Sequence, residues 1–271
     1  MLKYCAAGWK MTLWNPFLIF SLFLYQLLWG LFLYRFVQSV VVPLLHRYPG
    51  EGMTADLQAI FAAESRFRLM KTDLADPYLW TLAAVFVVRM ALTPVLNAGI
   101  YHSIQQTHVD GKRSFLEGVR RWSFPFFWLY LGQTALSFAP LLWLIPRAGS
   151  LTEELFLEGR IDAQPALLAA CYLAYTVFVK LAAMYAQFGL VAGTGRLRAL
   201  KLLLMRFPKA AALSALILGA YALVAVLGAA LSIAAAGLAA VVLYQTYHLI
   251  KAVFKLWEIG AQHQYFAAAT R

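Results

Sequence analysis

The residues best able to do chemistry in this sequence are polar side chains inside or at the edge of long apolar runs. Arg89 stands near the middle of one run, and Lys180 and Lys255 belong to two others. An ionised side chain in hydrocarbon costs at least about 2.5–3.5 kcal/mol, so it normally faces a bundle interior or a wet cavity. We therefore predict an internal site that binds an anion or a lipid headgroup. Its candidate residues are Arg89, Asn97, Gln133, Lys180, Gln187 and Lys255.

Helical spacing supports shared faces for these side chains. Asn97 lies eight residues after Arg89, and Gln187 lies seven after Lys180. Such spacings bring two side chains to one side of a helix. Glu258 is the one acid in or near a predicted span, so cations outnumber internal partners. A lipid phosphate, an anionic substrate or an acidic residue of another subunit could supply the missing charge. The alternative is that the lysines extend to the headgroups.

Catalytic signatures are missing from the sequence. It has no phosphate-binding G-x-x-x-x-G-K-[ST] motif, no H-E-x-x-H and no G-x-S-x-G. Cys5 and Cys171 are too far apart in the sequence to suggest a disulfide framework or a metal site. We therefore expect no catalytic residues, no metal, no cofactor and no enzymatic activity.

Composition indicates what must position the polar residues. The chain has 271 residues, of which 62% are hydrophobic and 13% charged, against roughly 25% charged in a soluble domain. A span needs about 20 apolar residues. We predict an all-α polytopic membrane protein of six transmembrane helices in a single membrane domain over residues 1–271. The spans cover about 13–42, 78–104, 124–145 and 165–191, and two more share the uncharged stretch 210–250, divided near Ser232–Gly237.

Charge distribution predicts the orientation. Basic loops alternate with mixed or acidic ones, and Lys/Arg-rich loops remain in the cytoplasm. We therefore expect a multi-pass protein of the plasma membrane, with both termini in the cytoplasm and with His46–Pro77 and Arg147–Gln164 outside. Residues 56–69 read as a short amphipathic helix in the first outer loop. The net charge of +11 then reflects basic loops facing anionic lipids, and we expect no nucleic-acid partner.

Three similar sequence segments precede the odd-numbered predicted spans. Each is a basic amphipathic stretch followed by a proline at the start of the span, namely Pro16, Pro125 and Pro208. Proline suits the first turn of a helix. The segments KLAAMYAQ at 180–187 and KLWEIGAQ at 255–262 are similar in even-numbered spans. We predict three repeated helical hairpins with basic interfacial helices, over residues 1–107, 108–192 and 193–271.

The segment GKRSFLEGVRRWSFPFFWLYL at 111–131, with its counterpart at 195–216, resembles a broad group of bacterial six-helix integral membrane proteins. One branch of that group forms the membrane domain of glycerophosphodiester phosphodiesterases. The resemblance covers residues of spans two to six. It implies an architecture and a bacterial plasma membrane, and it carries no activity.

These features favour a non-enzymatic integral membrane component, a permease-like or accessory subunit of a membrane complex. Its expected partners are anionic membrane lipids and another membrane or ATPase subunit. One alternative is a stand-alone transporter or channel for an anionic or amphiphilic solute, which requires a continuous polar cavity. Another is a membrane-embedded lipid-modifying enzyme, which requires a carboxylate or histidine beside a nucleophile.

Overall fold

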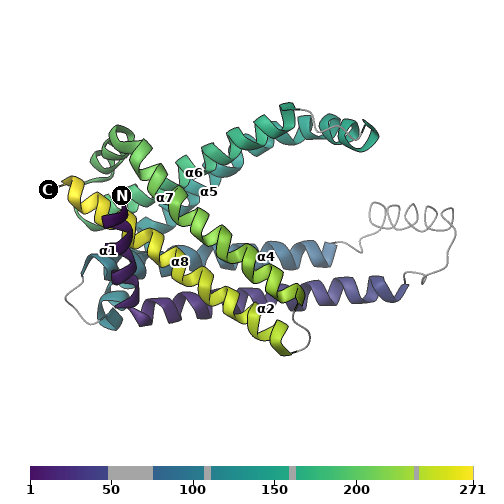
Figure 1. Cartoon of the computed structure of the whole chain (residues 1–271), viewed down its shortest axis with the longest axis horizontal. Helices are drawn as coiled ribbons and strands as arrows, with labels where there is room; N and C mark the ends of the chain where they lie inside the picture. The colour runs from purple at the N-terminus through teal and green to yellow at the C-terminus, as the bar shows by residue number, and fades with distance from the viewer. Residues whose placement is uncertain (48–75, 107–110, 159–162, 235–237, 271) are drawn as a thin grey trace. The chain divides into compact units, whose positions relative to one another are not determined.

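The computed structural model describes residues 1–47, 76–106, 111–158, 163–234 and 238–270. These residues form seven helices and contain no strand, so the all-α prediction is confirmed for the described chain (Figure 1). The helices are α1 (Leu2–Leu13), α2 (Pro16–Arg47), α4 (Asp76–Gln105), α5 (Gly111–Glu158), α6 (Ala163–Val191), α7 (Arg196–Ala234) and α8 (Leu238–Thr270).

Four helices are long and apolar enough to cross a membrane. They contain Pro16–Ser39, Tyr78–Gln105, Leu167–Val191 and Arg196–Leu231. The first three correspond to the first, second and fourth predicted spans, and the last contains the fifth, which was predicted to begin only at residue 210. Large apolar side chains on them remain exposed, such as Trp80 at 75% and Val226 at 68%, as expected of surfaces that face lipid. By helix length and hydropathy the chain is a multi-pass membrane protein.

The predicted third and sixth spans lie within α5 and α8. The described parts of these two helices add no further span by the same measure of length and hydropathy, so six spans remain a prediction. The helix break predicted near Ser232–Gly237 is confirmed, since α7 ends at Ala234 and α8 begins at Leu238. The amphipathic helix predicted over 56–69 lies outside the described residues.

The chain divides into two compact units. The larger unit contains residues 1–23 and 93–271, and the smaller unit contains residues 24–92. In the larger unit, α1 packs on α8, α7 packs on both α6 and α8, and α5 packs on α6. Its core is apolar, and its fully buried side chains include Leu18, Phe126, Leu181, Tyr185, Leu203, Leu213 and Leu256.

Small residues let helices of the larger unit approach closely. A Cβ added to Gly8 of α1 would lie 2.5 Å from the backbone N of Ala261 in α8. A Cβ on Gly118 of α5 would lie 2.5 Å from the Cβ of His102 in α4. His102 is itself buried there, and its Nδ1 lies 2.9 Å from the carbonyl oxygen of Ser114. This histidine therefore joins α4 to α5.

The connection between α6 and α7 is a short glycine turn. Gly193 and Gly195 have φ angles of 70° and 90°, a region that favours glycine because it has no Cβ. The backbone N–H of Gly195 donates to the carbonyl oxygen of Gly189 at 3.2 Å. This turn places the basic start of α7 directly after α6.

The three prolines used to define the predicted repeat have different surroundings. Pro16 is the first residue of α2, after α1 has ended at Leu13. Pro208 lies inside α7, where Arg206 has non-helical backbone angles of φ −122° and ψ 18°. Pro125 lies inside the long helix α5. A proline within a helix removes one backbone hydrogen bond and crowds the preceding turn, which accounts for the kink in α7. The threefold repeat itself remains a prediction.

In the smaller unit, the described parts of α2 and α4 run antiparallel. The rings of Phe36 and Tyr78 have centroids 6.3 Å apart, while further along Arg89 lies over the ring of Trp29. Rising residue numbers in one helix therefore match falling numbers in the other. This pairing positions the side chain of Arg89.

Candidate functional site

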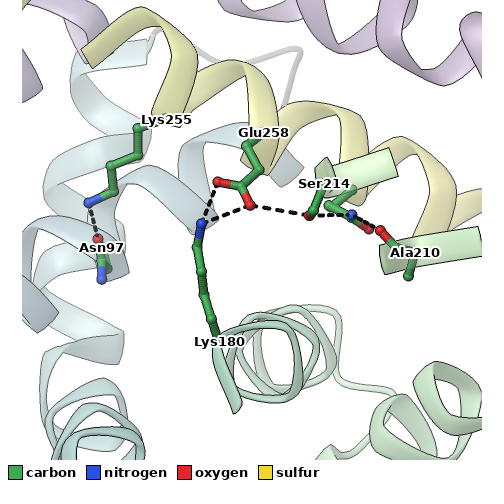
Figure 2. A network of polar contacts seen from close by, with 7 residues as sticks. Asn97, Lys180, Ala210, Ser214, Lys255 and Glu258 are labelled. Carbon is green, nitrogen blue, oxygen red and sulfur yellow. Dashed lines mark hydrogen bonds and ion pairs between the residues drawn. The ribbon is translucent and has the colours of Figure 1, made fainter. Parts of the chain in front are cut away.

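An ion pair lies between two of the long helices of the larger unit. The Nζ of Lys180 in α6 donates to both carboxylate oxygens of Glu258 in α8, at 2.8 and 2.7 Å (Figure 2). The Glu258 side chain is only 15% exposed, whereas that of Lys180 is 49% exposed. A carboxylate held away from water needs such a partner, because an unpaired buried charge is costly.

Further polar groups extend from the carboxylate into the core. The hydroxyl of Ser214 in α7 donates to Oε1 of Glu258 at 3.2 Å. The Nε2 of Gln262 donates to Oγ of Ser214 at 2.9 Å and to the carbonyl oxygen of Ala210 at 2.8 Å. The Tyr185 hydroxyl donates to Oε1 of Gln262 at 3.0 Å. These five residues and Lys180, contributed by α6, α7 and α8, are called the polar network below.

Helical periodicity explains why the network can form. Glu258 and Gln262 are four residues apart in α8, as are Ala210 and Ser214 in α7, so each pair lies on one helix face. Gln262 is fully buried, and both ends of its amide are bonded. A buried amide with paired donors and acceptor avoids the desolvation penalty that an unpaired one would carry. The network therefore fixes three helices against one another.

A second contact joins α4 to α8. The Nζ of Lys255 donates to Oδ1 of Asn97 at 3.3 Å (Figure 2). Both residues belong to the predicted site, so the structure brings two of its six members together. Lys180 is bonded instead to Glu258, an acid that was noted in the sequence but was not placed in the site.

The other predicted site residues lie elsewhere. Gln187 is buried in α6 with 3% of its surface exposed, and Gln133 is half-buried in α5. Arg89 is an exposed residue of the smaller unit. Sequence reasoning missed Tyr185 and Ser214 altogether. A hydroxyl in an apolar span was the available signal, but many such hydroxyls bond within their own helix, as Thr134 does with the Tyr130 carbonyl.

The contact between Ser214 and Glu258 is a hydroxyl beside a carboxylate, the pair that a lipid-modifying enzyme would require. Two features point to a structural role instead. Both carboxylate oxygens accept hydrogen bonds from Lys180, and Ser214 has only 6% of its surface exposed. A nucleophile has to reach its substrate and its base has to accept a proton. This arrangement binds helices together.

Arg89 borders a cavity of about 390 Å³ in the smaller unit. Its guanidinium carbon lies 6.0 Å from the centroid of the Trp29 ring, within the range of a cation–π interaction. The other lining residues are apolar: Phe32, Leu33, Leu82, Ala83, Val85 and Phe86. The cavity thus combines one cation with an apolar and aromatic wall.

The described part of the chain contains no group of three or more His, Cys, Asp or Glu residues able to hold a metal ion. Comparisons with protein-family models, curated proteins and solved structures give no match. The resemblance to bacterial six-helix membrane proteins therefore remains a prediction.

Proposed function

We propose that this chain is a non-enzymatic, six-span integral membrane component that works beside another protein, as a permease-like or accessory subunit. The observation that carries the proposal is the polar network. The Lys180 cation pairs with the Glu258 carboxylate, and Ser214 links that carboxylate to the Gln262 amide, so that hydrogen bonds join α6, α7 and α8. Polar groups used in this way stabilise a helix bundle.

Helix lengths support six spans. At 1.5 Å per residue, α8 with 33 residues and α5 with 48 residues both exceed the roughly 30 Å of a hydrocarbon core. Added to the four apolar helices, they complete three hairpins with both termini on one side. The predicted side is the cytoplasm.

Cations near the starts of α2, α5 and α7 favour an acidic partner or anionic lipids. The basic residues before the predicted odd-numbered spans are exposed, among them Lys10, Lys112, Arg113, Arg196, Arg198 and Lys201. Surface charge of one sign attracts a surface of the opposite sign. We propose that these residues contact an acidic face of the partner subunit at the cytoplasmic boundary.

Native mass spectrometry of the tagged chain, extracted from its own membrane in mild detergent, tests this function. We expect a second subunit at fixed stoichiometry, lost in an Arg198→Glu/Lys201→Glu variant and kept in the charge-conserving Arg198→Lys/Lys201→Arg control. A chain that is solitary at every detergent and salt concentration, and that transports a solute alone in liposomes, contradicts the proposal.

Cysteine labelling tests the proposed topology. In a Cys5→Ser/Cys171→Ala background, Lys112→Cys and Arg198→Cys should resist a membrane-impermeant maleimide added to intact cells. Asp76 is the first residue of α4, whose other end at Gln105 precedes Lys112 in the chain. Asp76→Cys should therefore react. Labelling of Lys112→Cys from outside rejects the orientation.

A stand-alone transporter for an anionic amphiphile is the second candidate. The cavity beside Arg89 favours it, because apolar walls next to a cation suit a solute with a charged head and an apolar tail. Uptake of such a solute by liposomes containing only this chain would support the transporter.

A further inference from the structure

The cavity at Arg89 extends to one side of the guanidinium only. On α4, the lining residues Leu82, Ala83, Val85 and Phe86 all precede Arg89, and on α2 the lining residues Phe32 and Leu33 follow Trp29. Because these helix segments run antiparallel, both sets extend from the guanidinium toward the level of Phe36 and Tyr78. The cation thus stands at one end of an apolar cavity.

The depth of Arg89 limits what can reach it. Arg89 lies eleven residues beyond Tyr78, the first residue of its candidate span, or about 16 Å along the helix axis at 1.5 Å per residue. That is about half of the roughly 30 Å hydrocarbon core. A small hydrated anion would have to lose its water to enter this depth. An anion that carries its own apolar chain also has to desolvate its head, but the burial of the chain offsets part of that cost.

The size of the cavity limits the ligand further. A volume of about 390 Å³ lies near the lower end of the roughly 300–1,000 Å³ range of small-molecule sites. It suits one alkyl chain better than two. Two aromatic walls, Phe32 and Phe86, add contact area for such a chain.

We propose that this cavity binds a single-chain amphiphile with an anionic head, the class to which long-chain fatty acids belong. The head contacts the guanidinium of Arg89, whose planar fork matches the two oxygens of a carboxylate. The chain lies against Phe32, Leu82 and Phe86. The inference deepens the second candidate function by naming the ligand class of its cavity, but it does not depend on transport, since an accessory subunit and a transporter can both hold such a ligand.

Photocrosslinking tests the proposal on the full chain in phosphatidylcholine nanodiscs. The probe is a long-chain fatty acid with a diazirine in its tail, and the matched neutral probe is the corresponding alcohol. We expect the acid to label peptides within residues 24–39 and 78–92, and the alcohol to label them about tenfold less, the factor expected for loss of a charged hydrogen bond. Equal labelling by both probes overturns the role of charge.

Variants separate the site from general lipid contact. Arg89→Leu should reduce labelling by the acid about tenfold without changing labelling by the alcohol, and Arg89→Lys should retain part of it. Arg35→Leu removes an exposed arginine of the same unit that does not line the cavity, and it should behave as wild type. Ala83→Trp fills the cavity and should reduce labelling by both probes. If Arg35→Leu and Arg89→Leu lose labelling equally, or if Ala83→Trp labels as wild type, the assignment is wrong.

Discussion

The polar network and the Arg89 cavity hold cations in apolar helices in different ways. Lys180 lies 2.7 Å from a carboxylate oxygen supplied by α8, and that carboxylate also accepts a hydrogen bond from Ser214. Arg89 lies over an aromatic ring and borders an apolar cavity. The first cation is neutralised inside the chain and joins helices. The second stands at the end of a space that a ligand can occupy, so the two sites should respond differently to mutation.

The largest expected effect is the loss of the carboxylate. Glu258→Leu leaves the Lys180 ammonium without its ion pair, and breaking a buried pair costs about 3–5 kcal/mol. Because a lysine side chain can extend toward the lipid headgroups once it has lost its partner, our expectation lies at the lower end, about 3 kcal/mol. The midpoint of thermal unfolding in detergent should fall clearly. Glu117→Leu, an exposed acid on α5, is the matched control and should unfold like wild type.

Removing the buried amide should cost somewhat less. Gln262→Leu deletes the groups that bond to Tyr185, Ser214 and the Ala210 carbonyl. An unpaired buried polar group costs about 1–3 kcal/mol, so we expect about 2 kcal/mol in the same unfolding assay. Gln264→Leu on the same helix, where the side chain is less buried, is the control. Equal effects at both positions would show that the network adds nothing specific.

The packing of α1 on α8, away from both cation sites, allows a separate test of stability by thermal unfolding. Gly8→Ala places a Cβ within 2.5–2.8 Å of Ala261 atoms, and such overpacking costs about 1–3 kcal/mol. Gly219→Ala meets no atom within 4 Å and should be neutral or stabilising because alanine favours helix.

Cys5 reports on the same contact between α1 and α8. Burial raises the pKa of the Cys5 thiol, so alkylation at neutral pH should be slow in the wild type, because the thiolate is the reactive form. Gly8→Ala should accelerate it. An unchanged alkylation rate together with unchanged stability would contradict the close packing of α1 on α8.

Arg89→Leu should have the smallest effect on stability. The cation–π contact with Trp29 contributes about 0.5–1 kcal/mol in water and about 2 kcal/mol when desolvated, and leucine suits the apolar lining. Because the substitution also removes a charge whose placement in hydrocarbon is costly, we expect a thermal midpoint close to wild type for the ligand-free protein in detergent. A loss as large as that of Glu258→Leu would mean that Arg89 also joins helices, and the contrast between the two sites would fail.

Sequence patterns were sufficient to place most helices, because long apolar runs and basic loops are local properties. The break between α7 and α8 falls where the uncharged stretch was divided. The partner of Lys180 was beyond local reasoning. Glu258 lies three residues from Lys255 on the same helix, a spacing that brings side chains together, yet its carboxylate bonds to Lys180 of another helix. Which faces of α6 and α8 meet depends on packing through Leu181, Tyr185 and Leu256, and spacing within one helix does not encode it.

The three proline junctions illustrate the same limit. A proline after a basic stretch occurs three times in the sequence, but the chain breaks before Pro16, kinks before Pro208 and continues through Pro125. Asn15 helps to end the first of these helices, since its side-chain N–H donates to the Met11 carbonyl at 2.9 Å. Neighbouring side chains and tertiary packing decide which outcome a proline produces.

A double-mutant cycle tests most directly whether Lys180 and Glu258 form an internal structural pair. The free energy of unfolding is measured for wild type, Lys180→Met, Glu258→Leu and the double variant in one detergent. We expect the double variant to be at least about 1 kcal/mol more stable than the sum of the single effects predicts, since contacting charges couple by about 0.5–3 kcal/mol and an apolar pair can replace a buried ion pair. Additive effects of the two substitutions would contradict the account.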